Sequence, residues 1–329
     1  ARIAVWQVAS SVLVLGASIA LVPLLPGAWA FVAVPLIAGA SVRVFVLQHD
    51  CGHGSLFGTK RVNDAVGTML SWWTGVPFDP WRIEHQWHHN HQGKLEKRGI
   101  DRVNSPMTVR EARSDPKAAN MRNRFIALPT VLVVGAWSLI IKRKRLVGFF
   151  PFRPGFPNRI PDRATQVRGM LLTLVPYVAL HVCLLAALGL RAWGIVIFAC
   201  IVAASSGALL FWVQHNFEHG FHAEGEQWDF VSVAVRGSSY VRFGPVLRWV
   251  TASIGLHHVH HLNPRIPNYR LEPARRAMPS LAAVEPLTLA DLRKTFTHVF
   301  WDEDRGVMVP IAEVGLEGGL EGATGSRSE

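Results

Sequence analysis

The stretch GMLLTLVPYVALHVCLLAALGL, from Gly169 to Leu190, has twenty-two residues and contains no Asp, Glu, Lys or Arg. A second apolar run of the same length, Ala192–Val213, follows directly after Arg191. A bilayer core is crossed by about 20 apolar residues in a helix. The two runs are therefore expected to form a pair of membrane-spanning helices joined at Arg191.

Two more apolar runs lie near the start of the sequence. Ile3–Val22 carries no charge, and Ala28–Leu47 carries only Arg43. A cleaved leader fits less well, because only Arg2 precedes the first run and the chain continues through two prolines and a glycine into the second run. The expected fold is an all-α integral membrane protein with four transmembrane helices in two hairpins, at about residues 3–22, 28–47, 169–190 and 192–213.

The basic residues indicate how the helices are oriented. The formal net charge is +11, and lysine and arginine crowd the polar regions Lys60–Arg124 and Lys142–Arg168. The short connectors around Pro23–Gly27 and Arg191 carry a single basic residue. By the positive-inside rule, the crowded regions face the cytoplasm and the connectors face outward. This distribution explains the charge without a nucleic-acid partner, and we expect none.

The polar regions are expected to form one helical cap on the cytoplasmic side. Phe125–Ile141 is apolar, but a crossing there would place the basic residues that follow it on the outer side. We therefore expect residues 125–141 to form an interfacial helix. A single membrane domain is expected over residues 1–310, and the Gly-rich residues 311–329 are expected to be a disordered tail.

Histidine is enriched, with 15 residues in 329, and its spacing is more informative than its number. HQWHH and HHVHH place histidines at i, i+3 and i+4, whereas HDCGH and HNFEH place pairs at i and i+4. On a helix these offsets put the imidazoles on one face, about 5–6 Å apart at Cβ. The histidines of these four segments are His49, His53, His85, His88, His89, His215, His219, His257, His260 and His261.

These segments favour a metal site over isolated structural histidines. One pair at a helix end would be interpreted as a hydrogen-bonding or capping group, but four such segments on one membrane face favour metal. Imidazole binds zinc, copper, iron and nickel, and eight or nine histidines suit two ions better than one. A two-metal site beside lipid-embedded helices indicates oxidative chemistry on an apolar substrate, for which non-haem iron is the usual agent. The three cysteines include no CxxC pair, which excludes an iron–sulfur cluster held by four cysteines of this chain.

HDCGH, HQWHH and HHVHH, in this order and with these separations, resemble the three histidine boxes of the membrane fatty acid desaturase family. The segment HHVHHLNPRIPNYRL (His257–Leu271), with QHNFEH before it, is similar to the bacterial and plastid-type omega-6 (delta-12) acyl desaturase branch. The resemblance covers about residues 30–275. It implies oxygen-dependent removal of two hydrogens from adjacent methylenes, which leaves a cis double bond in a membrane acyl chain. Two iron ions (Fe2+/Fe3+) would be the cofactor and dioxygen the co-substrate.

The resemblance also implies roles for individual residues. His215 is a second-tier residue, expected close to the metal through water. The sequence leaves open whether His215, His91, His222 or His258 contacts metal. No catalytic residue beyond the metal ligands is expected. The implied iron ligands are His49, His53, His85, His88, His89, His257, His260 and His261, with His219 as the ninth.

Four carboxylates near the boxes are candidates for orienting the ligands. A ligand imidazole usually donates its second N–H to a carboxylate or a carbonyl. Asp50, Glu84, Glu218 and Asp229 are close enough in sequence to accept such bonds. We expect them to orient imidazoles without binding metal.

The expected partners follow from this chemistry. The substrate would be a fatty acyl chain in membrane lipid, acyl-CoA or an acyl carrier. The sequence has no GxGxxG fingerprint after a strand and no haem-binding HPGG stretch, so a separate electron donor such as a ferredoxin is expected. The expected location is a bacterial inner membrane, with membrane lipids around the helices and the active site on the cytoplasmic side.

Two other functions stay open at this point. A hydroxylase or ketolase of alkanes or carotenoids uses similar boxes, but HDCGHGS together with NPRIPNY favours the desaturase. A metal transporter would carry polar ligands inside its helices near the bilayer midplane, where only His181 qualifies.

Overall fold

The computed structural model describes residues 2–97, 106–126 and 163–316. Most of these residues are helical, which confirms the expected fold class. The longer helices are α1 (Arg2–Leu21), α2 (Ala33–Gly52), α3 (Lys60–Thr74), α4 (Phe78–His91), α6 (Pro116–Ile126) and α8 (Arg163–His215). The shorter ones are α5 (Val109–Ser114), α9 (Phe230–Arg236), α10 (Pro245–Val250), α11 (His257–Leu262), α12 (Leu271–Ala277), α13 (Pro279–Ala282) and α14 (Leu289–Lys294).

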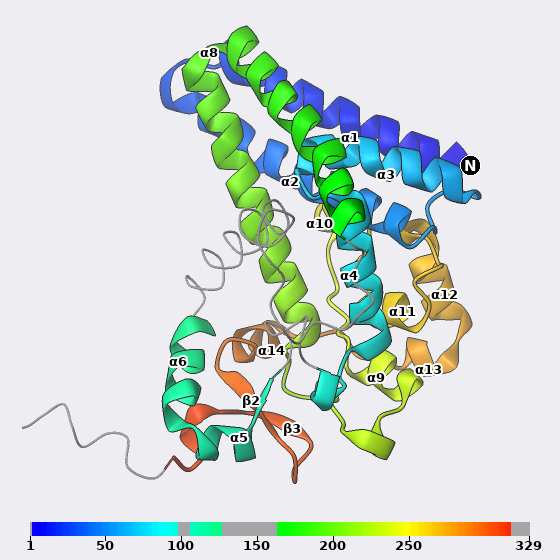
Figure 1. Cartoon of the computed structure of the whole chain (residues 1–329), viewed down its shortest axis with the longest axis vertical. Helices are drawn as coiled ribbons and strands as arrows, with labels where there is room; N and C mark the ends of the chain where they lie inside the picture. The colour runs from blue at the N-terminus through cyan, green and yellow to red at the C-terminus, as the bar shows by residue number, and fades with distance from the viewer. Residues whose placement is uncertain (1, 98–105, 127–162, 317–329) are drawn as a thin grey trace, which may run out of the picture.

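In the described part of the chain, three helical segments are long and apolar enough to cross a membrane, namely Arg2–Leu24, Gly27–Gly52 and Ala164–His215. The third has 52 residues, about 78 Å of helix at 1.5 Å per residue, whereas a bilayer core is about 30 Å thick. Its backbone leaves the helical region at Gly189 (φ 77°, ψ 166°), where the chain reverses and α8 becomes a hairpin with two arms (Figure 1). A positive φ of this size is accessible to glycine at little cost.

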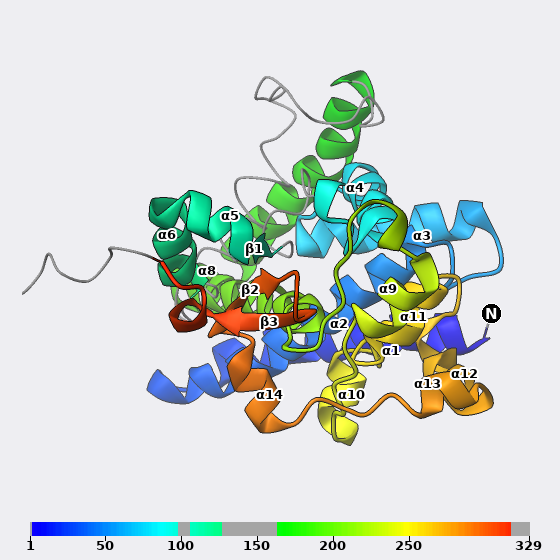
Figure 2. The same cartoon turned by 90° about the horizontal axis from the view of Figure 1, so that it is seen from below.

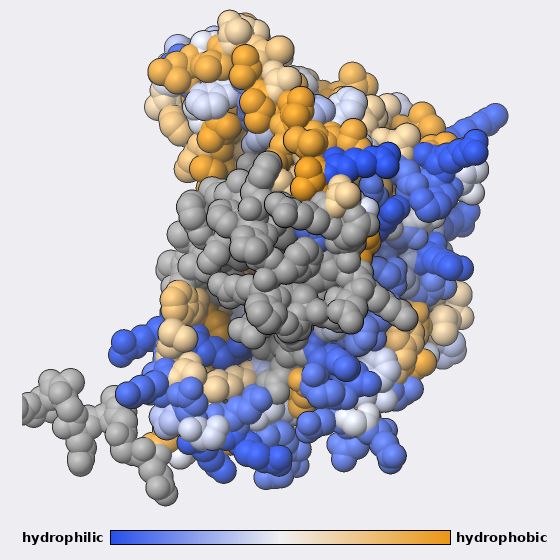
Figure 3. Space-filling model, in the orientation of Figure 1, coloured by the Kyte–Doolittle hydropathy of each residue, from blue (hydrophilic) through white to orange (hydrophobic). Residues whose placement is uncertain are grey.

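The two helical hairpins are joined at their tips. The connector between α1 and α2 contains the 3₁₀ turns η1 (Val22–Leu24) and η2 (Gly27–Val32). Arg191, which follows the reversal in α8, donates from Nη2 to the carbonyl of Gly27 at 2.7 Å. Apolar side chains gather over α1 and the arms of α8, whereas the opposite end of the molecule is hydrophilic (Figure 3). This division matches a membrane part and a polar cap.

Helix α2 lies at the centre of the membrane part. Its residues Ile37, Val44 and Leu47 are buried in a core cluster with side chains of α1, α3 and α8. Two buried polar contacts tie α3 to its neighbours. Trp73 donates from Nε1 to Oγ of Ser41 at 2.9 Å, and the hydroxyls of Ser71 and Thr173 are 2.9 Å apart. Because these groups are satisfied in pairs, they are compatible with an apolar surrounding.

The cap contains a small sheet that the sequence interpretation did not include. Strand β1 (Met107–Thr108) pairs in parallel with β2 (His298–Asp302), and β2 pairs antiparallel with β3 (Val307–Pro310). The sheet packs against α5 and α6 through buried side chains that include Val299 and Phe300. Figure 2 shows these elements side by side at one end of the cap.

The remaining predicted segments are described only in part. Of the expected interfacial helix at 125–141, the structure describes Phe125 and Ile126, which end α6, and the rest lies outside the described residues. Of residues 311–329, the 3₁₀ turn η8 (Ile311–Glu313) and the buried Val314 pack on the cap, and Arg113 donates from Nε to the Val314 carbonyl at 2.7 Å. Residues 317–329 lie outside the described part.

The packing of α3 against α4 leaves no space at Gly67. A Cβ at this position would overlap the ring of Phe78. We expect Gly67→Ala to lower the free energy of unfolding by about 1–3 kcal/mol, the usual cost of overpacking a core. Thermal unfolding of the protein in lipid nanodiscs measures this effect.

Gly194 provides the control, since it lies in α8 and a Cβ added to it would meet no atom within 4 Å. Gly194→Ala should leave the stability unchanged or raise it by up to about 1 kcal/mol, because alanine is the better helix former. Equal stability of the two variants would contradict the packing described for Gly67.

Candidate metal centre

Four helices deliver histidines to one buried region beneath the membrane part. Helix α2 carries His49 near its end, and His53 follows as its C-terminal capping residue. Helix α4 carries the HQWHH segment, α8 ends at His215, and α11 consists almost entirely of the HHVHH segment. The i, i+3 and i+4 spacing therefore places imidazoles on one face of α4 and of α11.

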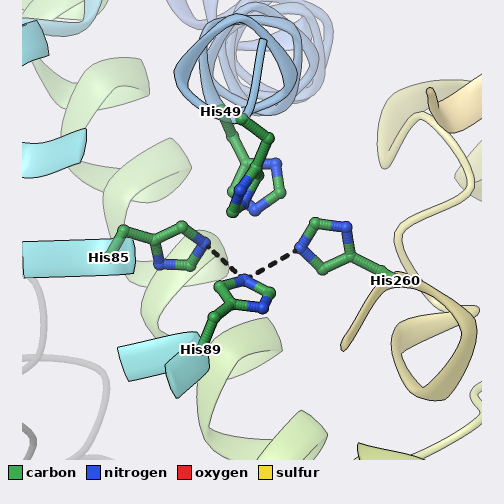
Figure 4. A group of neighbouring side chains, drawn as sticks. His49, His85, His89 and His260 are labelled. Atoms are coloured by element: carbon green, nitrogen blue, oxygen red, sulfur yellow. Dashed lines mark hydrogen bonds between the residues drawn. The ribbon is translucent and has the colours of Figure 1, made fainter. Parts of the chain in front are cut away.

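The first group joins α2, α4 and α11. One nitrogen from each of its five histidines lies within 4.8 Å of the corresponding nitrogen of every other member. The Nε2 atoms of His85 and His89 are 3.1 Å apart, and those of His89 and His260 are 3.2 Å apart. Figure 4 shows His49, His85, His89 and His260 pointing toward one another. The group consists of His49, His53, His85, His89 and His260.

The second group adds the end of α8. His88, His215 and His261 have ligand nitrogens within 4.8 Å of one another. His257 adjoins this group, because its Nε2 lies 3.0 Å from Nε2 of His215. The two groups are neighbours, since the rings of His89 and His261 are stacked with centroids 4.1 Å apart.

The arrangement fits metal ions better than a network of hydrogen bonds. A neutral imidazole has one donor and one acceptor nitrogen, so each close nitrogen pair holds at most one proton. Among the described residues, Nε2 of His53 and Nε2 of His261 are buried without a hydrogen-bond partner. Unpaired buried nitrogens that face other imidazoles offer lone pairs to a cation. Five nitrogens in one group and three to four in the other suit two ions.

Aromatic rings hold several of these imidazoles in place. Trp81 stacks on His85 with centroids 4.6 Å apart and an interplanar angle of 17°, and it also contacts His49 at 5.6 Å. Gly52 leaves room for this indole, because a Cβ there would lie 2.8 Å from Cζ3 of Trp81. On the other side, the ring of Phe211 lies 5.3 Å from His88 and 5.2 Å from His215.

Asp50, predicted to orient a ligand imidazole, lies beside His49. Its Oδ1 lies 3.3 Å from Nδ1 of His49. Its Oδ2 accepts hydrogen bonds from the backbone N and from Nδ2 of Asn268, both at 2.9 Å. The carboxylate is buried, and its two hydrogen bonds from Asn268 hold it in place while its other oxygen faces His49.

The other three carboxylates lie in different settings. Asp229 is the N-cap of α9 and accepts from the backbone N of Ser232 at 2.8 Å, which lowers its pKa. Glu218 forms an ion pair with Lys294. Glu84 is half-buried on α4, directly before His85. Asp229 thus caps the N-terminus of α9.

His215 and His219 lie in different surroundings, although the sequence predicted His219 as a ligand and His215 as a second-tier residue. The spacing i, i+4 suggested one helical face for both, but α8 ends at His215 and the chain turns at Phe217–Gly220. His219 is consequently exposed, and its Nε2 lies 4.0 Å from Glu218. The structure places His215 in the second group and His219 outside both groups. The helix end, marked by Asn216 and Gly220, is the signal that could have separated the two residues.

The histidines left open have other neighbours. The ring of His91 stacks on Trp87 with centroids 4.2 Å apart, His222 contacts Trp301, and His258 contacts Tyr240. His181 lies within the membrane part, between the rings of Trp73 and Tyr177. None of these four belongs to either metal-competent group among the described residues.

Burial keeps most of the cluster neutral. Loss of hydration is the largest cause that lowers the pKa of these imidazoles well below 6.5, and the charges of neighbouring imidazoles lower it further. A neutral imidazole presents the lone pair that a metal requires. The histidines with a lowered pKa are His53, His85, His89, His257, His260 and His261.

Comparisons with known proteins connect this geometry to one family. The family described as "Fatty acid desaturase" is matched by residues 26–290. A protein of Bacillus subtilis (strain 168) named fatty acid desaturase is 31% identical over 283 residues, which cover 85% of this chain and 76% of that protein.

Two plant proteins are similar at lower identity. The sn-2 acyl-lipid omega-3 desaturase (ferredoxin), chloroplastic, of Arabidopsis thaliana is 28% identical over 71% of this chain and 51% of its own length. The omega-6 fatty acid desaturase, chloroplastic, of the same plant is 23% identical over 78% of this chain and 53% of its own length. The chain thus spans about half the length of these two relatives.

The different positions of His215 and His219 lead to a test of the metal groups. We expect His215→Ala to lose about half of the bound metal, because the second group loses the residue that both His88 and His257 contact. His219→Ala should retain all of it, since that side chain is exposed outside both groups. Metal per chain is measured by elemental analysis of the purified proteins. Loss of metal in His219→Ala with full retention in His215→Ala would contradict the assignment.

The lowered pKa values predict how the metal-free protein responds to acid. In the unfolded chain these imidazoles have their ordinary pKa of 6.5, so below that pH the unfolded state binds more protons than the folded state. Each such group then reduces the free energy of unfolding by up to about 1.4 kcal/mol per pH unit. The melting temperature of metal-free protein should fall steeply between about pH 7.5 and about pH 5.5. A melting temperature that stays constant over this range would show that the cluster is not buried as neutral imidazoles.

Proposed function

The chain belongs to the fatty acid desaturase family, and from this premise we propose that it is an oxygen-dependent acyl desaturase of omega-6 (delta-12) type. The reaction would remove two hydrogens from adjacent methylenes of a membrane acyl chain and leave a cis double bond. Dioxygen, two electrons and two protons would be consumed, and two molecules of water would be released. The observation that carries the proposal is the pair of adjoining histidine groups at the end of the membrane helices.

The proposed metal is iron. His49, His53, His85, His89 and His260 would hold one ion, and His88, His215, His257 and His261 would hold the other. When bound, two iron ions supply the dioxygen chemistry that cleaves an unactivated methylene C–H bond. The nitrogen-only set and its division into two neighbouring groups support this assignment.

The residues around the ions would orient the ligands and exclude water. Asp50 would accept the second N–H of His49, which sets the imidazole tautomer that offers Nε2 to the metal. Trp81 and Phe211 cover the imidazoles with apolar rings and restrict their rotation. A rigid, dry site holds one C–C bond of the substrate near the ions while other positions of the acyl chain stay away.

The electrons would come from a separate donor of ferredoxin type, reaching the site from the cytoplasmic face of an inner membrane. One plant relative carries ferredoxin in its name, which supports this choice. The omega-6 position is supported by the resemblance of His257–Leu271 and by the omega-6 relative, whereas another relative is named for the omega-3 position. A single catalytic domain over residues 1–310 is part of the proposal.

Expression in a host without polyunsaturated lipids, together with a ferredoxin and its reductase, tests the function. We expect new dienoic acyl chains whose second double bond is located by mass spectrometry at the omega-6 carbon. The matched control is His88→Ala, which should abolish the product and lower the iron content, because His88 lies in the second group. A double bond at another position would reject the omega-6 assignment alone. If the acyl chains were unchanged and an alkane or carotenoid were oxidised instead, the proposed desaturase function would be rejected in favour of a hydroxylase or ketolase.

A further inference from the structure

A loop of the cap returns into the membrane part just before the last histidine segment. Residues Tyr240–Leu256, here called the finger, leave and re-enter the cap at one point. The backbone N of Val241 donates to the Gly255 carbonyl at 2.8 Å, and Tyr240 and Leu256 form an antiparallel bridge. Gly255 is required at this narrow base, because a Cβ there would overlap the Val241 carbonyl. Helix α10 lies within the finger.

The finger packs on the spanning helices at mid-height. Val250 packs closely against α2 at Gly39, because a Cβ at this glycine would lie 3.2 Å from Cγ2 of Val250. Ala252 and Ile254 are buried in a cluster with side chains of α2 and α8. Gly39 precedes His49 by ten residues, or about 15 Å of helix, so the contact lies about half a bilayer core away from the metal site. The residues of α2 and α8 in this cluster are Ala38, Val42, Val46 and Ala203.

Arg43, the one charge in the second apolar run, holds the finger. It is 4% exposed, its Nε donates to Oγ of Ser11 on α1 at 2.9 Å, and its Nη1 donates to the carbonyl of Trp249. The guanidinium also lies 4.4 Å from the centre of the Trp249 ring. A charge inside a membrane helix is costly and is kept where it satisfies polar groups. Arg43 adds a side-chain donor to the Trp249 carbonyl, which also accepts from the backbone N of Ala252 at 3.1 Å, and so links α2 to the end of α10.

The backbone after α10 confirms that the finger has a defined shape. Ala252 and Ser253 have positive φ angles of 44° and 62°, which non-glycine residues adopt at a cost. Such conformations persist where the surrounding contacts fix them, and here Ala252 is buried against α2. The finger is therefore a packed element of the membrane part.

The outer side of the finger is apolar and exposed. Val246 is 75% exposed, Leu247 53% and Trp249 36%. Figure 2 shows α10 at the outside of the molecule. The stretch FGPVLRWVTASIGL, residues 243–256, has fourteen residues and one charge, a length typical of re-entrant or interfacial segments. Arg242 and Arg248 are exposed beside these side chains.

We propose that the finger is inserted in the leaflet nearer the metal centre and contacts bilayer lipid directly. Val246, Leu247 and Trp249 would lie among acyl chains, while Arg242 and Arg248 extend to lipid phosphates. Lipid is the occupant because α10 packs on α2, and α1 and α2 expose large apolar side chains such as Leu13 and Leu36. The inference rests on the membrane placement in the proposed function. Since His257 follows Leu256 directly, the finger would connect the third histidine box to a lipid-contacting segment.

Spin labels on three matched leucines test this proposal. The native cysteines Cys51, Cys183 and Cys200 are replaced by alanine, and a label is attached in separate variants Leu247→Cys, Leu13→Cys and Leu289→Cys. Leu13 on α1 is 68% exposed and Leu289 on α14 of the cap is 67% exposed, so all three positions present a large exposed side chain. Collision with oxygen, which concentrates in the bilayer, is compared with collision with a water-soluble nickel chelate in nanodiscs of phosphatidylcholine and phosphatidylglycerol.

We expect the labels at positions 247 and 13 to show a several-fold higher ratio of oxygen to nickel collisions than the label at 289. A label at 247 that behaves like the one at 289 would place the finger in water and overturn the proposal. Shielding of position 247 from both reagents would indicate a protein occupant and would also overturn it. If position 13 itself behaves like 289, the membrane placement fails, which separates that failure from the failure of the finger alone.

A second measurement uses the unmodified chain, in case the cysteine-free protein does not fold. A phospholipid with a diazirine in its acyl chain is incorporated in the nanodisc and activated by light, and labelled peptides are identified by mass spectrometry. Label within residues 243–256 as well as in α1 supports the insertion. Label in α1, α2 and α8 with none in residues 243–256 rejects it.

Discussion

At the end of the membrane helices, buried imidazoles pack directly against one another. Pairs such as His85–His89 and His88–His215 bring ring nitrogens within 3.1 and 3.2 Å, and each pair can share only one proton. A buried set of this kind is stable when cations take up the remaining lone pairs. The helices must therefore deliver their histidines to one place from four directions. Much of the fold serves that requirement.

Helix α2 brings its histidines to this place because it crosses the apolar part and ends at the histidine groups. It packs against α1, α3 and α8 along its length and then presents His49 and His53. Because the same helix packs in the membrane part and carries His49 and His53, the histidine groups lie at a fixed distance from the apolar surface. The contact between Arg191 and Gly27 ties the arms of α8 to the α1–α2 connector. The position of His215, at the end of α8, is therefore fixed relative to α1 and α2.

The sequence was sufficient for features that depend on long runs or on repeated spacing. Four apolar runs, one of them carrying Arg43, predicted apolar helices. The spacing selected His49 and His53 of HDCGH and the six histidines of HQWHH and HHVHH, which the fold brings together. The choice between His215 and His219 depended on where α8 ends, a boundary that i, i+4 spacing does not define. The strands of two to five residues were too short for a period-two pattern. The finger was missed because its largely apolar stretch, residues 243–256, lies inside a region that is polar on average.

Helix α1 is connected to the metal centre through a chain of buried polar groups. Gln7 of α1 and Asn268 form a reciprocal amide pair, with distances of 2.7 and 3.2 Å. Asn268 in turn binds Asp50, and Asp50 faces Nδ1 of His49. If one buried group in this chain lost its hydrogen bond, the orientation of the next group would also be disturbed. The hydrogen bonds of such a chain therefore depend on one another. The segment NPRIPNY thus joins the third histidine box to the first through one asparagine, which gives its position after HHVHH a physical role.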